Sequence, residues 1–325
     1  MANHPLVTFL LLTFNQENYI LDALEGAVCQ DYPNLEIIIS DDCSTDNTND
    51  IIKKFLTSYH GDHKIIYNRN DSNLGLIPHF NKAISLSHGD YIVLAAGDDI
   101  SLPNRTSISV NAIQETGAMS LATNFKYIDS NGTPLNSLGF QTLKEPTLYT
   151  INDYISLISA PPSGPSRIIN RIIMDTFGPF LDDCPTEDTT LILRALLLGC
   201  VAHTNTTCVL YRWHGQNISA PENLYHKIKP RKIYNQYYHD IKIAKSKNLI
   251  NQKTFRNLKK TINDYLQYQI FIRKIYSEHN KYIRHLHCIL YLINPHILPA
   301  HKKKSYLRQN CKDLFIIWDA LHGKK

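Results

Sequence analysis

Short apolar runs alternate with amphipathic segments along the first 130 residues, and this alternation constrains the fold more than any other feature. Four runs rich in Val, Ile and Leu lie at 6–12, 34–40, 64–68 and 90–96. They suit strands of a sheet that is buried on both faces. The segments between them, at 16–30, 45–59 and 78–87, place apolar residues on one helical face. This β-α-β-α order predicts an α/β fold with a doubly wound, mostly parallel sheet and helices on both faces.

Later segments extend this pattern. Pro103 suits the first residue of a fourth helix, and a strand is expected at 118–129. Residues 186–199 predict a helix with Thr186 as its N-cap and Gly199 just past its end. Further along, apolar residues recur at nearly heptad spacing at Phe255, Leu258, Ile262, Tyr265, Ile272 and Tyr276. This spacing indicates a helical hairpin that packs on itself or on the preceding domain.

Charge divides the chain into two parts. Residues 1–220 hold 12 Lys and Arg against 23 Asp and Glu, whereas residues 221–325 hold 22 against 6. The net charges are therefore −11 and +16, an asymmetry that indicates two different roles. We expect a catalytic domain over 1–220 and a basic, helical C-terminal extension over 221–325 that contacts a membrane or a second copy of the chain.

Cysteine usage and hydropathy indicate a cytoplasmic protein. The seven cysteines form no Cys-x-x-Cys pair and no signal peptide is recognised, so we expect reduced thiols. No stretch of 18 apolar residues occurs in the sequence, which argues against a transmembrane helix. The aromatic and basic residues of the C-terminal part follow a helical pattern rather than a stacking platform, so no nucleic-acid partner is expected.

Polar and aromatic side chains follow the ends of all four predicted strands. They are Thr13, Phe14 and Asn15, then Asp41 and Asp42, then Asn68 and Arg69, and finally Asp98 and Asp99. Ligands of open α/β sheets bind outside the carboxyl ends of the strands. A single turn of this kind could be an ordinary solvated loop, whereas four together predict a ligand crevice.

The sequence lacks the two common phosphate-binding motifs. Neither Gly-x-Gly nor Gly-x-x-x-x-Gly-Lys-Ser/Thr occurs, which excludes the dinucleotide fingerprint and the P-loop. Carboxylates repel phosphates unless a divalent cation lies between them, and Mg²⁺ and Mn²⁺ prefer carboxylate oxygens. Asp98 and Asp99 therefore predict an Mg²⁺ or Mn²⁺ site that binds a diphosphate.

Four blocks of the sequence resemble, in the same order, those of family 2 glycosyltransferases of the GT-A type. They lie at 10–48, at 73–105 with its acidic pair, at 167–199 with a Glu-Asp pair, and at 209–219 with Tyr-Arg-x-His-x-x-x-x-Ser. The resemblance covers residues 6–219, and the C-terminal third is not part of it. It implies a GT-A fold for this part, and the helical extension predicted from the apolar spacing follows it.

The resemblance also implies an activity. Such an enzyme transfers a sugar from a nucleoside diphosphate sugar, here UDP- or dTDP-linked, to an acceptor hydroxyl with inversion. The implied setting is bacterial surface polysaccharide synthesis (O-antigen, capsule or lipopolysaccharide), with a saccharide or lipid-linked saccharide as acceptor. The basic extension would then attach the enzyme to the anionic inner face of the cell membrane, or form a homo-oligomer.

Roles for single residues follow from the same resemblance. The implied donor-binding residues are Thr13, Phe14, Asn15, Asp42, Asn81 and Asp98. Among them, Phe14 lies against the base, and Asp42 accepts a hydrogen bond from the imide N–H of uracil or thymine. Asp99 and His214 bind the metal, and Asp188 is the general base. The Gly- and Pro-rich segment 160–166 lines the sugar.

Some residues also fit purely structural roles. Asp188 at a helix start favours the helix dipole, Asp42 could cap the next helix, and His214 could be an ordinary surface histidine. Relatives often carry Asp-x-Asp-Asp where this chain has Ala96, Gly97 and two aspartates, so we expect a weaker metal site than theirs rather than none. Two other functions stay open: a sugar-phosphate nucleotidyltransferase, and a non-catalytic module that binds nucleotide sugars.

Overall fold

A ten-stranded sheet lies at the centre of the part of the chain that the computed structural model describes, which is residues 4–139, 145–156, 165–215, 217 and 229–277. The strand order is β3-β2-β1-β4-β9-β6-β10-β5, with β7 beside β6 and β8 beside β10. The strands are β1 (Val7–Thr13), β2 (Leu35–Asp41), β3 (Lys64–Arg69), β4 (Tyr91–Ala96), β5 (Ile100–Ser101), β6 (Ser120–Ile128), β7 (Pro134–Leu138), β8 (Thr147–Thr150), β9 (Arg167–Asn170) and β10 (Cys200–Arg212).

Most of the long strands run in one direction, as the sequence predicts. Strands β1 to β4 form parallel pairs, and β6 pairs in parallel with β10. The short strand β9 runs antiparallel between β4 and β6 and joins these two parallel groups. Strands β5, β7 and β8 are also antiparallel to their partners. The four apolar runs of the N-terminal part correspond to β1, β2, β3 and β4.

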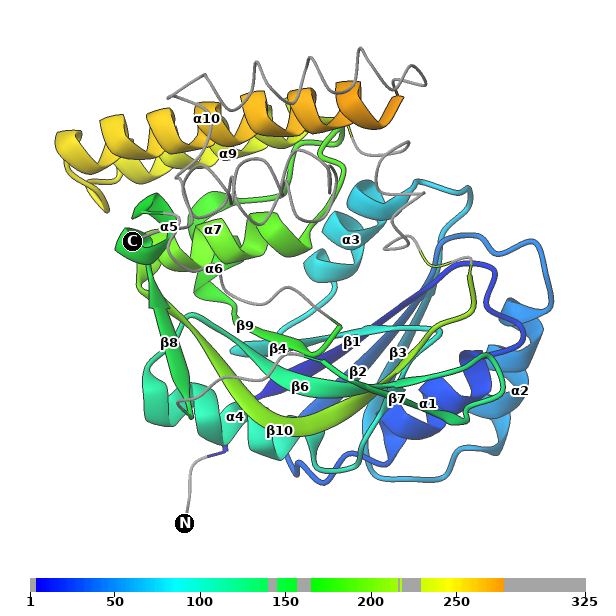
Figure 1. Ribbon diagram of the computed structural model, residues 1–325. Coiled ribbons are helices and arrows are strands. Elements are labelled where there is room, and N and C mark those ends of the chain that lie inside the picture. The colour runs from blue at the N-terminus through cyan, green and yellow to red at the C-terminus, as the bar shows by residue number, and fades with distance from the viewer. Residues whose placement is uncertain (1–3, 140–144, 157–164, 216, 218–228, 278–325) are drawn as a thin grey trace.

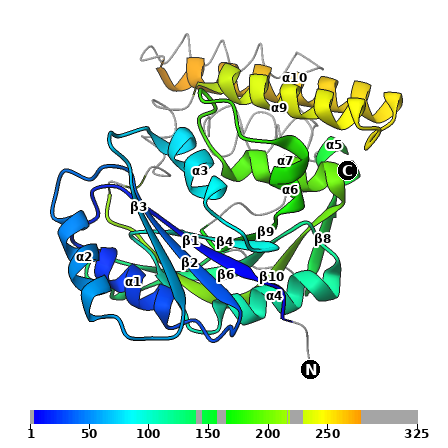
Figure 2. The ribbon, with the colours of Figure 1, turned by 180° about the vertical axis from the view of Figure 1, so that it is seen from behind.

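Helices cover both faces of the sheet (Figures 1 and 2). Helices α1 (Ile20–Val28), α2 (Thr48–Ser58) and α4 (Arg105–Thr116) supply one apolar core with Phe9, Leu11, Ile37 and Val93 of the strands. Helices α3 (Leu76–Ser85), α6 (Ile172–Phe177) and α7 (Asp188–Leu198) supply the other with Leu10, Ile38, Ile92 and Ile169. Alternate strand residues therefore enter opposite cores, and the predicted α/β architecture with a mostly parallel sheet and helices on both faces is confirmed.

A third layer lies over α7 (Figure 1). Helices α9 (Pro230–Ser246) and α10 (Gln252–Ser277) pack with α7 and the short α5 (Ile151–Ser156) around a separate apolar cluster. Leu258 and Ile262 are buried in it, which matches the predicted hairpin. The predicted extension is therefore helical over α9 and α10, and its residues 221–228 and 278–325 lie outside the described residues. Among those residues, no helix has the length and apolar character that a membrane crossing needs.

Two helix starts differ from the sequence prediction. Helix α4 begins at Arg105 with Asn104 at the N-cap position, so Pro103 as its first residue was wrong, and the Thr106 N–H of its first turn donates to the side chain of Gln30 at 3.0 Å. Helix α7 begins at Asp188 with Glu187 at the N-cap position, so Thr186 as N-cap was wrong. The Thr186 carbonyl instead accepts a hydrogen bond from the Thr190 hydroxyl, at 2.8 Å. Gly199 follows the helix end as predicted.

Candidate active site

The loops after β1 and β2 are held together by side chains at the carboxyl edge of the sheet. The Asn15 N–H donates to Ser44 Oγ at 2.9 Å, and Asn15 Oδ1 accepts from the Thr45 N–H at 2.8 Å. Asn15 adopts a positive φ of 53°, a conformation that Asn tolerates better than most residues. Beside it the Phe14 side chain is exposed (39%), so its ring is accessible for stacking.

Thr13 brings the loop after β4 close to β1. A Cβ at Gly97 would lie 2.5 Å from Thr13 Oγ1, so only glycine fits beside this side chain. Thr13 Oγ1 is buried without a hydrogen-bond partner among the described residues. The Thr13 carbonyl accepts the Asp42 N–H at 3.0 Å, and the three strand ends therefore meet at one place.

Asp42 is buried, and its carboxylate accepts three hydrogen bonds from the chain. The donors are Asn70 Nδ2 at 2.7 Å, the Leu74 N–H at 2.9 Å and the Gly75 N–H at 2.9 Å. Because Gly75 is the N-cap position of α3, Asp42 holds the start of that helix rather than of α2. Asp42 therefore does not cap the next helix, α2, and the predicted contact with the base stays a prediction.

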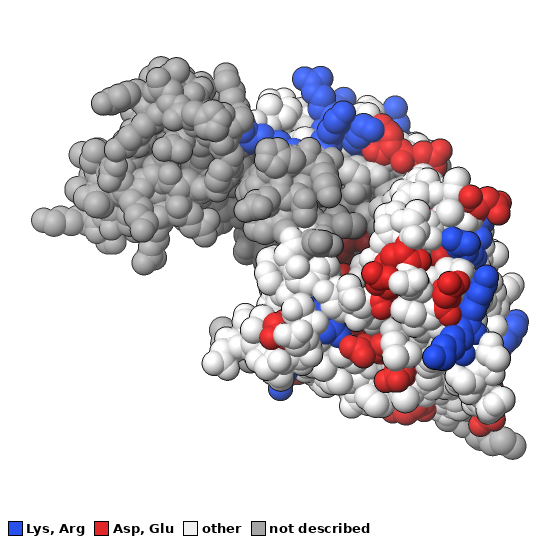
Figure 3. Space-filling view, turned by 90° about the vertical axis from the view of Figure 1, so that its right-hand side faces the viewer, with Lys and Arg blue, Asp and Glu red and all other residues white. Residues whose placement is uncertain are grey.

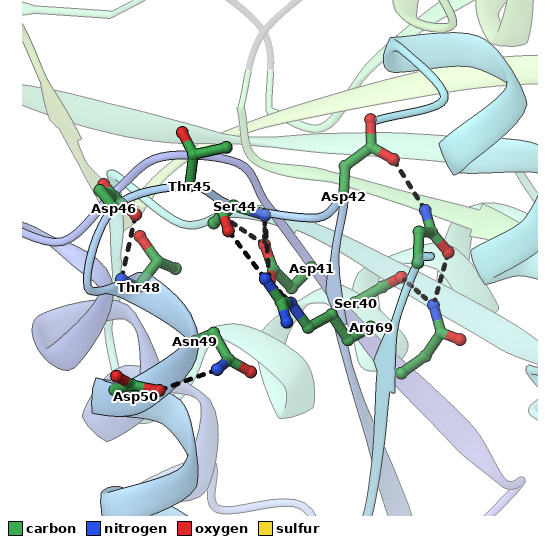
Figure 4. Close-up of polar contacts among 12 residues, drawn as sticks. Ser40, Asp41, Asp42, Ser44, Thr45, Asp46, Thr48, Asn49, Asp50 and Arg69 are labelled. Atoms are coloured by element: carbon green, nitrogen blue, oxygen red, sulfur yellow. Dashed lines mark hydrogen bonds and ion pairs between the residues drawn. The ribbon is translucent and has the colours of Figure 1, made fainter. Parts of the chain in front are cut away.

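Asp41 and Arg69 form a separate polar group (Figure 4). Arg69 Nε lies 3.3 Å from Asp41 Oδ2, and Arg69 Nη2 donates to the Ser44 carbonyl at 2.9 Å. The Ser44 hydroxyl donates to the same carboxylate. Asp41 is fully buried, so this network fixes the loop after β2, and it points away from Asp42 in the close-up.

The acidic pair after β4 meets the end of β10. His214 Nε2 lies 3.1 Å from Asp98 Oδ2, and Asp99 Oδ1 accepts the Arg212 N–H at 2.9 Å. Burial raises the pKa of Asp99 well above its usual range, and Asp98 adds to the effect. Carboxylate oxygens and an imidazole are ligands that Mg²⁺ and Mn²⁺ accept. The residue types therefore fit such a cation, although no group of three potential ligands is preassembled in the described part of the chain.

Asp188 and Glu187 are adjacent carboxylates in different surroundings. Arg167 Nε lies 3.2 Å from Asp188 Oδ1, and the guanidinium is 2% exposed. Glu187 Oε2 is buried and has no hydrogen-bond partner among the described residues. Burial, followed by the charge of Asp188, raises the pKa of Glu187 to about 7. Arg167 belongs to β9, which places the acid pair above the centre of the sheet.

Asn81 has a contact that the sequence did not predict. Its Nδ2 donates to the Phe180 carbonyl, and its Oδ1 accepts the Phe180 N–H, both at 2.9 Å. Asn81 therefore links α3 to the loop before α7, and its predicted donor contact stays a prediction. Of the predicted sugar-lining segment 160–166, residues 160–164 lie outside the described residues.

Four functional candidates were missed by the sequence reasoning: Glu187, Arg167, Arg212 and Tyr19. In the sequence, Glu187 is the neighbour of Asp188, and Arg212 lies two residues before His214. Arg167 and Tyr19 contact the site only because strands and loops far apart in the chain meet there.

Comparison with known proteins identifies the broad class. The family model described as "Glycosyl transferase family 2" matches residues 8–176. The Escherichia coli protein named "UDP-Glc:alpha-D-GlcNAc-diphosphoundecaprenol beta-1,3-glucosyltransferase WfaP" is 28% identical over 222 residues, which is 66% of this chain and 80% of that protein. Matches of 37% and 33% identity to proteins of E. coli K12 and Bacillus subtilis cover only 38% and 41% of those proteins, so the chain spans about two fifths of their length.

Solved structures share the fold at low sequence identity. S. aureus TarS 1–349 in complex with UDP-GlcNAc has a TM-score of 0.59 and 17% identity, over 82% of this chain and 72% of that one. The mannosyltransferase PcManGT from Pyrobaculum calidifontis, in complex with GDP-Man and Mn²⁺, has a TM-score of 0.53 and 13% identity, over 100% and 89%. At these identities the likeness concerns the fold alone.

Proposed function

This chain belongs to glycosyl transferase family 2, and we propose that it transfers a sugar from a UDP- or dTDP-linked donor to an acceptor hydroxyl with inversion. The observation that carries the proposal is the meeting of Asp98, Asp99 and His214 beside the loop that contains Phe14. Relatives named for colanic acid and teichuronic acid biosynthesis support a bacterial surface polysaccharide as the product. The acceptor is then a saccharide or a lipid-linked saccharide.

Donor binding uses the loops at the carboxyl edge of the sheet. The exposed ring of Phe14 stacks on the base, beside Thr13 and Asn15. Asp42 accepts the imide N–H of the base with the acceptor capacity that its three bonds leave, since a carboxylate offers about four lone-pair sites. Asn81 has one amide hydrogen beyond its bond to Phe180, and this hydrogen is its means of contacting the donor.

Transfer proceeds as a single in-line displacement. The acceptor oxygen forms a bond to the anomeric carbon while the bond from that carbon to the diphosphate breaks, which inverts the configuration. Asp188 takes the proton of the acceptor hydroxyl as general base. The buried Arg167 orients the Asp188 carboxylate and compensates its charge.

A divalent cation completes the donor site. Asp99 and His214 would hold Mg²⁺ or Mn²⁺, and Asp98 would face the donor ribose or the same cation. When bound, such a cation neutralises negative charge on the departing diphosphate. The Mn²⁺ in the similarly folded mannosyltransferase supports this assignment.

The basic helix pair supports attachment to a membrane. Residues 230–277 hold 11 Lys and Arg against two Asp. Lys and Arg gather at the top of Figure 3, at the height of α9 and α10, with Asp and Glu beside them, and both signs of charge occur lower on the same face. We infer that this charge favours binding to anionic lipid, which would hold the enzyme at the inner face of the cell membrane.

Hydrolysis of a panel of nucleotide sugars tests the proposal. The purified protein, with Mn²⁺, is incubated with UDP-, dTDP- and GDP-linked sugars, and the released nucleoside diphosphate is measured. We expect one UDP- or dTDP-linked sugar to be hydrolysed well above the others. Tight binding of a donor without turnover would indicate a non-catalytic binding module, and pyrophosphate-dependent release of a sugar phosphate would indicate a nucleotidyltransferase.

A further inference from the structure

We propose that Arg212 is the positioning residue that presents Asp98, Asp99 and His214 to the divalent cation. This inference rests on the metal assignment in the proposed function. Arg212 is the last residue of β10, and its side chain is 2% exposed. Because this side chain is buried, it can hold the residues of the site in place but does not itself contact the donor.

Arg212 contacts both members of the acidic pair. Its Nε donates to the Asp98 carbonyl at 2.9 Å, and its backbone N–H donates to Asp99 Oδ1 at 2.9 Å. The first bond fixes the turn of the main chain, and the second fixes the Asp99 carboxylate. The guanidinium charge also opposes the repulsion between the two carboxylates.

Arg212 also holds His214, through two intermediaries. Asn217 Nδ2 donates to the Arg212 carbonyl at 2.8 Å, while Asn217 Oδ1 accepts the His214 N–H at 3.0 Å. The Tyr19 ring has the Arg212 guanidinium 4.9 Å from its centroid and the His214 ring stacked at 4.9 Å. One arginine thus connects all three predicted ligands.

The guanidinium is anchored on its remaining sides. Nη2 donates to Asp22 Oδ2 at 2.6 Å, and Nη1 donates to the carbonyls of Asp129 and Ser130 at 3.5 and 3.2 Å. Every guanidinium nitrogen of Arg212 therefore has a partner. A lysine ammonium is a single point with three donors and cannot reach acceptors arranged around a planar fork.

Mn²⁺ titration of Arg212→Lys tests the proposal. Free Mn²⁺ is followed by its electron paramagnetic resonance signal in the presence of UDP. We expect the variant to bind Mn²⁺ about 10- to 100-fold more weakly than wild type, the usual effect of changing a group that orients a metal ligand. The matched control is Arg171→Lys. In the wild type, the Arg171 guanidinium donates to the Gly89 carbonyl and to Ser87 Oγ at the opposite end of β4. This control should keep wild-type Mn²⁺ affinity.

A second variant covers the case in which Arg212→Lys does not fold. Asp22→Asn removes only the ion pair, because the Asp22 side chain is 48% exposed. We expect a several-fold loss of Mn²⁺ affinity with unchanged circular dichroism. If Arg212→Lys folds and its Mn²⁺ affinity is unchanged, the positioning role of Arg212 is overturned. If Arg212→Lys does not fold, an unchanged Mn²⁺ affinity in Asp22→Asn overturns it. Absence of Mn²⁺ binding by wild type would instead overturn the metal assignment of the proposed function.

Discussion

At the residue scale, Asp188, the first residue of α7, differs from the acids of the preceding loop because the buried side chain of Arg167 contacts its carboxylate. We expect Asp188→Asn to keep the fold and donor binding and to lower turnover by about 10² to 10⁴, the usual contribution of a general base. The control is Asp182→Asn, since Asp182 is exposed in the same loop. Turnover is measured with the donor that the panel identifies. If Asp188→Asn turns over like the control, Asp188 has no part in the mechanism.

The raised pKa of Glu187 predicts how the free energy of unfolding changes with pH. Its folded pKa of about 7 exceeds the ordinary 4.5, so between these values the folded protein holds a proton that the unfolded chain releases. The free energy of unfolding therefore falls as pH rises through this window and stays low above it. The isosteric Glu187→Gln cannot lose a proton, and its stability should not show this fall.

Urea denaturation at pH 5 and pH 8 measures the effect. At pH 8 we expect Glu187→Gln to be more stable than wild type by about 2 kcal/mol, with a much smaller gain at pH 5. Glu115→Gln, an exposed residue of α4, is the control and should follow wild type at both values. An equal difference at both pH values would contradict the raised pKa.

At the element scale, α9 is tied to α7 by a buried ion pair. Arg194 and Asp240 are both fully buried, with Nε and Nη2 of the arginine each 3.0 Å from one carboxylate oxygen. Asp240→Ala leaves the Arg194 charge buried without its counter-ion, which costs about 3–5 kcal/mol. We expect this loss in urea denaturation, and a change below about 0.5 kcal/mol for the exposed Asn235→Ala of the same helix. A loss under 1 kcal/mol in Asp240→Ala would show that α9 adds little to the folded unit.

Periodicity of apolar residues predicted strands β1 to β4 and β6 with the helices between them, but it did not predict β10. Runs such as 34–40 are apolar on both faces because helices cover both faces of the sheet. Such a run of apolar residues can be recognised from the sequence of that segment alone. Strand β9 was not predicted because its four residues, Arg167–Asn170, are too short to show a period. Its antiparallel place between β4 and β6 depends on two strands distant in the chain.

The candidate site was predictable where neighbours in sequence are neighbours in space. Asp98 and Asp99 follow β4 directly, and topology alone carries them to the crevice. The partners of Asp42 and Asn81 were not predictable, because loops 28 and 99 residues away supply them. Such contacts depend on how the loops pack, which no local pattern encodes.

At the scale of the whole molecule, opposite charge separates the catalytic part from the C-terminal part. The +16 of residues 221–325 exceeds what pairing with the −11 of residues 1–220 needs. Residues 285–312, which join an apolar run to a lysine cluster, lie outside the described residues. An interfacial helix needs one apolar face with lysines beside it, and each Lys or Arg near an anionic surface contributes about 1 kcal/mol.

Vesicle co-sedimentation tests this membrane attachment. We expect the protein to sediment with anionic vesicles, less so at high salt, and to lose this binding when 285–312 is deleted. Neutral phosphatidylcholine vesicles are the control. Equal recovery with both lipids would show that the basic part serves packing or self-association instead, and full binding by the deletion variant would contradict the role of 285–312.

The metal-dependent donor site is the central claim, and its most direct test is turnover before and after chelation. Donor hydrolysis is measured on the full chain, after thorough treatment with EDTA, and again after Mn²⁺ or Mg²⁺ is restored. We predict loss of activity on chelation, recovery with either cation, and weakened metal-dependent donor binding in both Asp99→Ala and His214→Ala. Full activity in the chelated protein would contradict the account, and Ala96 in place of the usual first carboxylate would then explain why the cation is dispensable.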